Sequence, residues 1–100
     1  MITLNDALSN LNRPDDIGRF LLDLCTPAEI REMEMRWRVA QLLDAGDDSY
    51  RNIAEKTGTS TTTVTRVARF LNDEPHQGYR TALALALPRN AASRHAKRRA

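Results

Sequence analysis

The chain of 100 residues contains a single cysteine, Cys25, so it cannot form a disulfide bond within itself. Because Cys25 lies in the apolar run LLDLC, we expect it to be a buried small side chain. The sequence also lacks an apolar run near the ~20 residues that cross a membrane, and its first residues do not resemble a secretory signal. These absences predict a cytoplasmic protein without membrane contact.

Side chains suited to catalysis or to metal binding are also scarce. The two histidines, His76 and His95, lie in a predicted loop and in a basic terminal segment. Cys25 lies in a hydrophobic run, and no pair of carboxylates has a neighbouring nucleophile or the spacing of metal ligands. The sequence therefore predicts a protein that is not an enzyme and that holds no cofactor or metal.

Positive charge is concentrated in two segments, although the formal net charge is only +2. Residues 1–48 contain five arginines against ten acidic residues. Residues 49–71 contain three arginines and a lysine against one glutamate, and residues 89–100 contain five basic residues and no acid. This distribution is typical of nucleic-acid binding. Residues 89–100 have no apolar period, so we expect a disordered tail that either contacts phosphates or only adds solubility.

Residues 49–71, SYRNIAEKTGTSTTTVTRVARFL, predict two short helices joined by a tight turn. Ser49 and Ser60 can cap the two helices, and Gly58 lies where such a turn needs a positive φ. The second helix carries an apolar stripe formed by Val64, Val67, Ala68 and Leu71. This is the pattern of a helix-turn-helix, whose second helix usually enters the major groove of DNA. The alternative is an ordinary corner between two helices.

Hydroxyl side chains dominate the start of the second helix of this motif. They belong to Thr59, Ser60, Thr61, Thr62, Thr63 and Thr65. Thr and Ser are weaker helix formers than Ala, so a purely structural helix would gain from other residues. Hydroxyls and methyls at a helix N-terminus suit phosphate oxygens, base edges and thymine methyls. The alternative is a helix cap followed by a merely polar face.

Two helices are predicted before residue 27. Thr3 can cap the first, whose apolar stripe consists of Leu4, Leu8 and Leu11. Pro14 suits the first turn of the second helix. The second helix carries a broad apolar face made of Ile17, Phe20, Leu21, Leu22, Leu24 and Cys25. So broad a face on a short helix indicates contacts on more than one side.

The longest helix is predicted over residues 27–45. Thr26 and Glu29 form a capping box around Pro27, and Gly46 follows as a stop. After a break at residues 72–75, a last helix carries Tyr79, Ala82, Leu83, Leu85, Ala86 and Leu87 and ends at Pro88. The predicted architecture is all-α, with six helices and no strands.

One helical domain, residues 1–88, is predicted ahead of the tail. Its helices outside the helix-turn-helix have more apolar surface than one small subunit readily covers. We therefore expect a helical homodimer that presents two helix-turn-helix units. A symmetric dimer would place its two recognition helices one DNA turn apart, ~34 Å, on a pseudo-palindromic site.

The sequence resembles the tryptophan-repressor family. The shared features are Cys25-Thr26-Pro27, Arg36-x-Arg38, Gly46, Gly58 and Thr65-Arg66. The resemblance runs without a gap from about Leu24 to Asn72. The segments FLLDLCTPAEI, YRNIAEKTGTSTTTVTRV and RFLN are most similar to the YerC/YecD-like branch. The resemblance implies an all-helical, intertwined homodimer that binds operator DNA.

This resemblance also implies roles for individual residues. Arg51 matches a base-contacting arginine, whereas Thr63 and Arg69 match phosphate-contacting positions. Thr61, Thr62 and Thr65 match recognition-helix positions that face the groove. Arginine suits bidentate contacts with guanine, and threonine can meet a thymine methyl or a phosphate. The predicted DNA-binding residues are Arg51, Ser60, Thr61, Thr62, Thr63, Thr65, Arg66 and Arg69.

A ligand pocket is the second site that the resemblance implies. In the tryptophan-responsive repressor, two arginines hold the indole between them and a threonine helps to hold the amino group. Arg36, Arg66 and Thr26 stand at these positions. Val67 and Phe70 stand where that repressor has a glycine and a serine, and both add apolar bulk. We therefore predict that L-tryptophan is not the corepressor.

The predicted function is a sequence-specific transcriptional regulator, a repressor, that binds double-stranded DNA as a homodimer. One alternative is a repressor that responds to another metabolite or amino acid through Arg36 and Arg66. In another, these two arginines bind phosphates or pair with acids. A further alternative is a non-catalytic adaptor whose helix-turn-helix binds protein.

Overall fold

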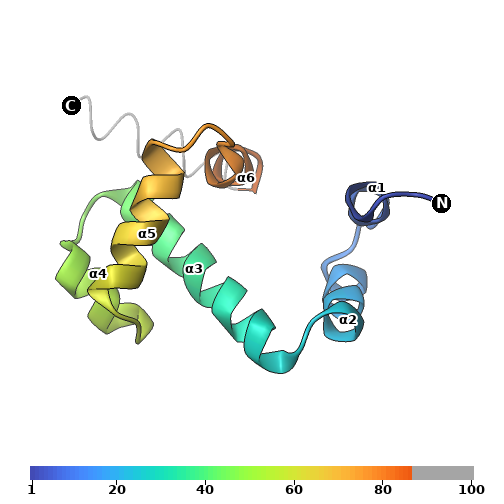
Figure 1. The fold of residues 1–100 in the computed structure, drawn as a ribbon, viewed down its shortest axis with the longest axis horizontal. Helices are drawn as coiled ribbons and strands as arrows, with labels where there is room; N and C mark the ends of the chain where they lie inside the picture. The colour runs from blue at the N-terminus through green and yellow to red at the C-terminus, as the bar shows by residue number, and fades with distance from the viewer. Residues whose placement is uncertain (87–100) are drawn as a thin grey trace. The chain divides into compact units, whose positions relative to one another are not determined.

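Helices form all the regular secondary structure in the part of the chain that the computed structural model describes, residues 1–86 (Figure 1). They are α1 (Leu4–Ser9), α2 (Pro14–Leu24), α3 (Pro27–Ala45), α4 (Tyr50–Thr57), α5 (Thr61–Asn72) and α6 (Gly78–Ala86). The prediction of six helices and an all-α fold is confirmed for these described residues. The predicted helix end at Pro88 and the predicted basic tail, residues 89–100, lie outside the described residues.

Local capping determines where α3 begins and ends. The Thr26 hydroxyl accepts a hydrogen bond from the Glu29 amide at 3.2 Å, and Glu29 Oε1 accepts one from the Thr26 amide at 2.8 Å. Hydrogen bonds from the Thr26 amide and then from its hydroxyl lower the pKa of the Glu29 carboxyl, so this cap weakens only as the pH falls through that lowered value. Gly46 follows α3 with a φ of 75°. The predicted capping box and glycine stop are both present.

The first helix is shorter than its leucine stripe predicts. It ends at Ser9, so Leu11 lies beyond it. The Ser9 hydroxyl and the Asn10 side-chain amide both donate to the Asp6 carbonyl at 2.8 Å. These short polar side chains compete with the backbone for the helix carbonyls, which explains why the helix stops before the third leucine.

Contacts along the chain divide it into two units, Met1–Met33 and Glu34–Ala100, and the boundary falls within α3. In the first unit no residue of α1 or α2 is buried. Leu22 is 65% exposed and Leu24 is 50% exposed. Cys25 is half-buried, so the expectation of a buried thiol is not met within a single chain. The broad apolar face of α2 is therefore half-buried at four residues and exposed at Leu22 and Leu24 in one copy of the chain.

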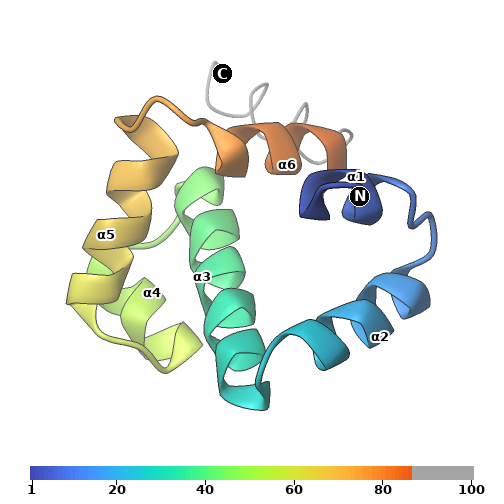
Figure 2. The same cartoon turned by 45° about the vertical axis from the view of Figure 1, so that its right-hand side comes forward.

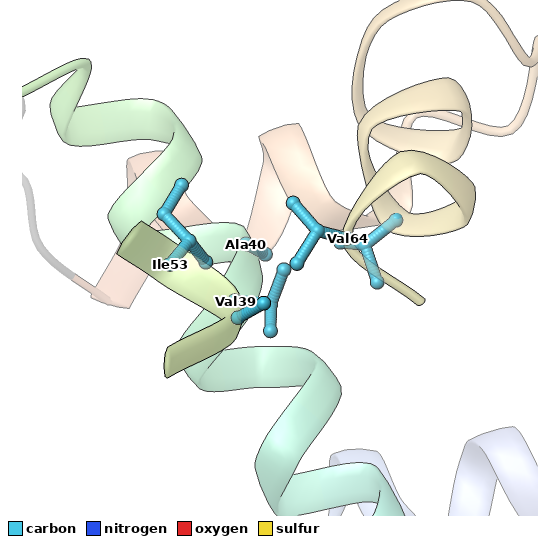
Figure 3. Close-up of a cluster of buried hydrophobic side chains, with 6 residues drawn as sticks. Val39, Ala40, Ile53 and Val64 are labelled. Atoms are coloured by element: carbon cyan, nitrogen blue, oxygen red, sulfur yellow. The ribbon is translucent and has the colours of Figure 1, made fainter. Parts of the chain in front are cut away.

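The second unit has a core that three helices build together. Val39 and Ala40 come from α3, Ile53 and Ala54 from α4, and Val64 from α5. Figure 3 shows the side chains of Val39, Ala40, Ile53 and Val64 gathered in one cluster. Val39, Ile53 and Val64 are 0% exposed. The views in Figures 1 and 2 place α4 and α5 beside the later part of α3. The predicted apolar stripe of α5 is confirmed, because all four of its residues are buried.

A partly buried polar cluster joins three helices at one end of this unit. Asp44, near the end of α3, is only 7% exposed. Arg80 of α6 donates to Asp44 Oδ1 at 2.9 Å and to the Asn72 side-chain oxygen at 2.7 Å. Asn72 is the last residue of α5. One guanidinium thus links α6 to the ends of α3 and α5, and it satisfies a carboxylate that is costly to bury.

Replacing Arg80 by alanine should therefore destabilise the fold. Arg80→Ala removes two hydrogen bonds, one of them to a buried charge, and should lower the free energy of unfolding by about 1–3 kcal/mol. Urea unfolding followed by circular dichroism at one protein concentration measures this. Arg51→Ala is the matched control: its side chain is 86% exposed and 3.9 Å from Glu55, so its loss should change stability by less than about 0.5 kcal/mol. Equal effects of the two variants would contradict the assignment.

Candidate nucleic-acid interface

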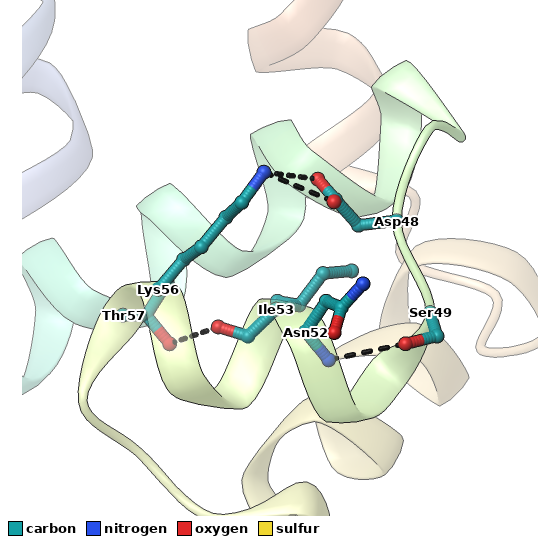
Figure 4. Close-up of polar contacts among 6 residues, drawn as sticks. All are labelled: Asp48, Ser49, Asn52, Ile53, Lys56 and Thr57. Atoms are coloured by element: carbon teal, nitrogen blue, oxygen red, sulfur yellow. Dashed lines mark hydrogen bonds and ion pairs between the residues drawn. The ribbon is translucent and has the colours of Figure 1, made fainter.

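The N-terminus of α4, the first helix of the helix-turn-helix, is stabilised by a side-chain cap and by an ion pair beside it. The Ser49 hydroxyl accepts a hydrogen bond from the Asn52 amide at 3.1 Å, as the sequence predicts (Figure 4). Asp48, just before this cap, receives the Lys56 ammonium on both carboxylate oxygens at 2.9 Å. This pair ties the loop before α4 to its last turn. It also means that an acid from outside the motif offsets the charge of Lys56.

The turn between α4 and α5 depends on one glycine. Gly58 has φ 72° and ψ 27°, the left-handed conformation that only glycine adopts without strain. Its amide and the Thr59 amide both donate to the Ala54 carbonyl, the latter at 3.0 Å. The Thr57 hydroxyl donates to the Ile53 carbonyl at 2.8 Å. These bonds satisfy the Ile53 and Ala54 carbonyls, and the left-handed turn leads the chain directly into α5.

The hydroxyl groups at the start of α5 differ in their hydrogen-bond partners. The Ser60 hydroxyl caps the helix by accepting from the Thr63 amide at 3.1 Å, and it lies 3.2 Å from the Thr63 hydroxyl. The Thr65 hydroxyl donates to the Thr61 carbonyl at 2.9 Å. Ser60, Thr61, Thr62 and Thr65 are exposed, and Thr63 is half-buried. The structure therefore gives Ser60 and Thr63 a local structural task beside their predicted contacts with DNA.

A groove of about 360 Å³ follows the outer face of α5. It is lined by Thr61, Thr62, Thr65, Arg66 and Arg69. These five predicted DNA-binding residues are thus brought together on one surface. Ser60 and Thr63 stand at the N-terminal end of the same helix, and Arg51 lies on α4 with a highly exposed side chain.

The charge of this face is less than the sequence count indicates. Arg69 lies 3.4 Å from Glu74, which follows α5, and Arg51 lies 3.9 Å from Glu55. Arg66 makes no ion pair with any residue in the described part of the chain. The Arg51 pair is largely exposed, so a phosphate or a base could displace the glutamate at little cost.

A smaller cavity of about 150 Å³ lies behind α5. Its walls come from Arg36, Arg66, Val67, Phe70 and Tyr79. Four of these residues belong to the predicted ligand pocket. Thr26, the fifth predicted member, belongs to the first unit, where its hydroxyl caps α3, and it is not among the lining residues. Sequence reasoning missed Tyr79 as a wall of this cavity, because no local spacing relates α6 to α3 and α5.

The ring of Phe70 is held by two arginines. The Arg66 guanidinium lies 5.1 Å from the ring centroid and the Arg69 guanidinium lies 5.2 Å from it. Both distances are within the range of cation–π attraction. Val67, the other departure from the tryptophan-responsive repressor, is 1% exposed and belongs to the hydrophobic core. The two residues therefore do more than add bulk: Val67 packs α5 into the core, and Phe70 contacts two arginines of its own helix.

These features define a class of protein. A helix-turn-helix packed on a third helix, with hydroxyls and arginines exposed along its second helix, is a DNA-binding architecture. The sequence model of the family described as "Trp repressor protein" matches residues 1–86. The chain therefore belongs to the Trp repressor family, whose members are DNA-binding regulatory proteins. This confirms the family resemblance.

Two relatives support this assignment. The uncharacterized protein YerC of Bacillus subtilis (strain 168) is 39% identical over 69 residues, which cover 69% of this chain and 65% of YerC. The chain thus matches just under two thirds of the length of that relative. A crystal structure of a TrpR-like protein from Eubacterium eligens ATCC 27750 has 39% sequence identity and a TM-score of 0.74, and the match covers 84% of this chain and 86% of that one.

Other kinds of site are not found in the described part of the chain. Within residues 1–86, no three histidine, cysteine or acidic side chains gather into a group that could hold a metal ion. None of the helices described here is long and apolar enough to cross a membrane. His76 is an exposed residue between α5 and α6. That the protein is not an enzyme and that it is cytoplasmic remain predictions.

The Gly58 turn gives a direct test of this motif. Gly58→Ala should lower the free energy of unfolding by about 1–2 kcal/mol, because an L side chain resists a positive φ. The added methyl meets no atom within 4 Å, so the cost comes from the backbone alone. Gly78→Ala is the control: its new methyl also meets open space, its φ is not positive, and stability should change by less than about 0.5 kcal/mol. If Gly58→Ala is as stable as wild type in thermal unfolding, the left-handed turn is wrong.

Proposed function

We propose that the protein is a sequence-specific transcriptional regulator, a repressor, that binds a pseudo-palindromic operator as a homodimer. The observation that carries this proposal is the groove on the outer face of α5, where three threonines and two arginines meet. A helix with this surface can dock in the major groove, which admits an α-helix. The helix is also anchored on its other face, because its apolar stripe is buried in the core.

The arrangement supports a division of labour among the predicted contacts. Arg51 has a long and exposed side chain at the start of α4, which suits a bidentate contact with guanine. Thr63 and Arg69 are proposed to contact phosphates, together with the exposed amides at the N-terminus of α5. Thr61, Thr62, Thr65 and Arg66 face the base edges. Phosphate contacts supply most of the affinity, and base contacts supply the sequence preference.

Exposed apolar side chains support the proposed homodimer. Ile2, Leu4, Leu22 and Leu24 are each at least half exposed in a single chain, and Leu85 of α6 is 77% exposed. Monomeric proteins rarely leave so much large apolar surface in contact with water. A second copy of the chain is the partner that the family resemblance implies. Twofold symmetry would give two recognition helices for the two halves of a pseudo-palindromic site.

We also propose that binding does not require L-tryptophan. The cavity of about 150 Å³ is small beside the roughly 300–1,000 Å³ of typical small-molecule sites. A cavity of about this size suits a single benzene-sized ring rather than an indole with its amino-acid group. Arg66, which the resemblance assigns to the indole, is already stacked on Phe70. These observations favour side chains over a corepressor as the groups that fill this space.

Duplex DNA enriched from a random library tests the proposed function. Wild-type protein should bind the enriched duplex as two chains per duplex, and its affinity should fall steeply as salt is added. Arg51→Ala should weaken binding by about 1–3 kcal/mol and relax the preference at one base position. Fluorescence anisotropy over a salt series, with repeated selection on the variant, measures both effects.

The matched control for this prediction is Glu55→Ala. It removes the same ion pair as Arg51→Ala but keeps the arginine, so it should leave affinity unchanged or raise it. An equal loss of affinity from Arg51→Ala on enriched and on random DNA would show that Arg51 contacts the phosphate backbone and not a base. If the protein binds no duplex even at low salt, the proposed DNA-binding function is wrong and a protein-binding adaptor is favoured.

Titration with L-tryptophan tests the second part of the proposal. Calorimetry should detect no micromolar binding to the wild-type protein, because Val67 and Phe70 add apolar bulk where the resemblance places the indole. The affinity for the enriched duplex should be the same with and without L-tryptophan. A clear micromolar heat, or a large gain in DNA affinity, would show that the ligand is a corepressor after all.

A further inference from the structure

Thr65 differs chemically from its neighbours on the recognition helix. Its hydroxyl donates to the Thr61 carbonyl one turn earlier, at 2.9 Å, although the residue is exposed. A hydroxyl has only one hydrogen to donate. While this bond lasts, Thr65 cannot donate to the acceptors on guanine, adenine or thymine. Thr61 and Thr62 line the same groove, and within the described residues their hydroxyls make no such bond.

The bond also decides which branch of the side chain can meet a partner. Cβ of threonine carries a hydroxyl and a methyl, and its stiff rotamers place the two in different directions. The hydroxyl is turned onto the backbone of α5, which leaves the methyl as the branch that can extend from the helix. Thr65 thus offers an apolar group in a groove whose other walls are hydroxyls and guanidiniums.

We propose that Thr65 selects thymine by contact between its methyl group and the thymine C5 methyl. This inference rests on the proposed docking of α5 in the major groove, and it names the base that Thr65 contacts. Thymine is the only one of the four bases that presents a methyl there, so an apolar contact at Thr65 distinguishes it from the other three. Arg66 and Arg69, which follow Thr65 on α5 and line the same groove, supply donors for guanine or phosphate instead.

A hydroxyl whose hydrogen is already used can still accept a hydrogen bond. The competing possibility is therefore that Thr65 accepts from the amino group of adenine or cytosine. The two possibilities make opposite predictions for substitutions that keep one branch of the side chain. Thr65→Val keeps a methyl and loses the hydroxyl, whereas Thr65→Ser keeps the hydroxyl and loses the methyl.

The test combines these variants with deoxyuridine, which lacks only the methyl of thymidine. A duplex is first enriched from a random library with the wild-type chain, and each thymidine is then replaced in turn by deoxyuridine. At one position in each half-site, the replacement should weaken binding of wild type and of Thr65→Val by about fourfold, the effect of one buried methyl group. Thr65→Ser should bind the unmodified duplex about fourfold more weakly, and deoxyuridine at that position should then cost it nothing further.

Thr62→Val is the matched control, because Thr62 lines the same groove with a hydroxyl that is free to donate. It should weaken binding, while Thr65→Val should not; equal tolerance of valine at both positions would overturn the inference. A loss of affinity with Thr65→Val and none with Thr65→Ser would assign recognition to the hydroxyl. Insensitivity to deoxyuridine at every thymidine would also overturn the inference.

These results would leave the proposed function standing, since duplex binding would persist. An absence of any duplex binding at low salt would overturn both. Thermal unfolding of each variant verifies that the helix remains folded.

Discussion

The packing of Val39, Ala40, Ile53 and Val64 is the contact on which the rest of the second unit depends. Small side chains at Ala40 and Ala54 leave room for α4 and α5 to approach α3 closely, while the branched residues fill the space between the helices. Each of these residues is buried, so α5 is held by one face only, and its opposite face is left to solvent. The surface that we propose to enter DNA is therefore a direct consequence of where the apolar stripe lies.

The same local bonds that form the motif assign different tasks to chemically similar residues. Ser60 and Thr63 cap the helix, Thr65 bonds to its own backbone, and Thr62 keeps a free hydroxyl. The sequence predicts the cap at Ser60 and with it the register of the helix, but it does not show which hydroxyl turns onto the backbone. The bond between Thr65 and Thr61 depends on the side-chain rotamer of Thr65, and the folded chain shows it.

Features set by neighbours in sequence were predictable, and features set by distant neighbours were not. The caps at Ser49 and Ser60, the capping box at Thr26 and the glycine turn at Gly58 were all correct, because each depends on a few adjacent residues. The link from Arg80 to the ends of α3 and α5, and Tyr79 in the cavity wall, arise from helices that meet only in the folded chain. The early end of α1 was missed because polar side chains at Ser9 and Asn10 outcompete the leucine pattern. The roles of the predicted DNA contacts depend on a partner, so a single chain leaves them as proposals.

Arg66 belongs to both candidate sites, the groove proposed to bind DNA and the cavity behind α5. It lines the groove on the outer face of α5 and also the small cavity behind it. A molecule in the cavity would therefore contact a residue that also lines the groove, so it could alter the surface that we propose to bind DNA. In this chain the ring of Phe70 lies against Arg66 and Arg69, so an internal side chain already makes the contact that a ligand ring would make. Because Phe70 is part of the chain, its contact with Arg66 does not depend on the concentration of a metabolite, as the contact of a free ligand would. The position of α5 itself is set by its buried apolar stripe, which packs without any ligand. We therefore expect the proposed recognition helix to be constitutively positioned, and regulation would then have to act through the amount of protein or through the dimer.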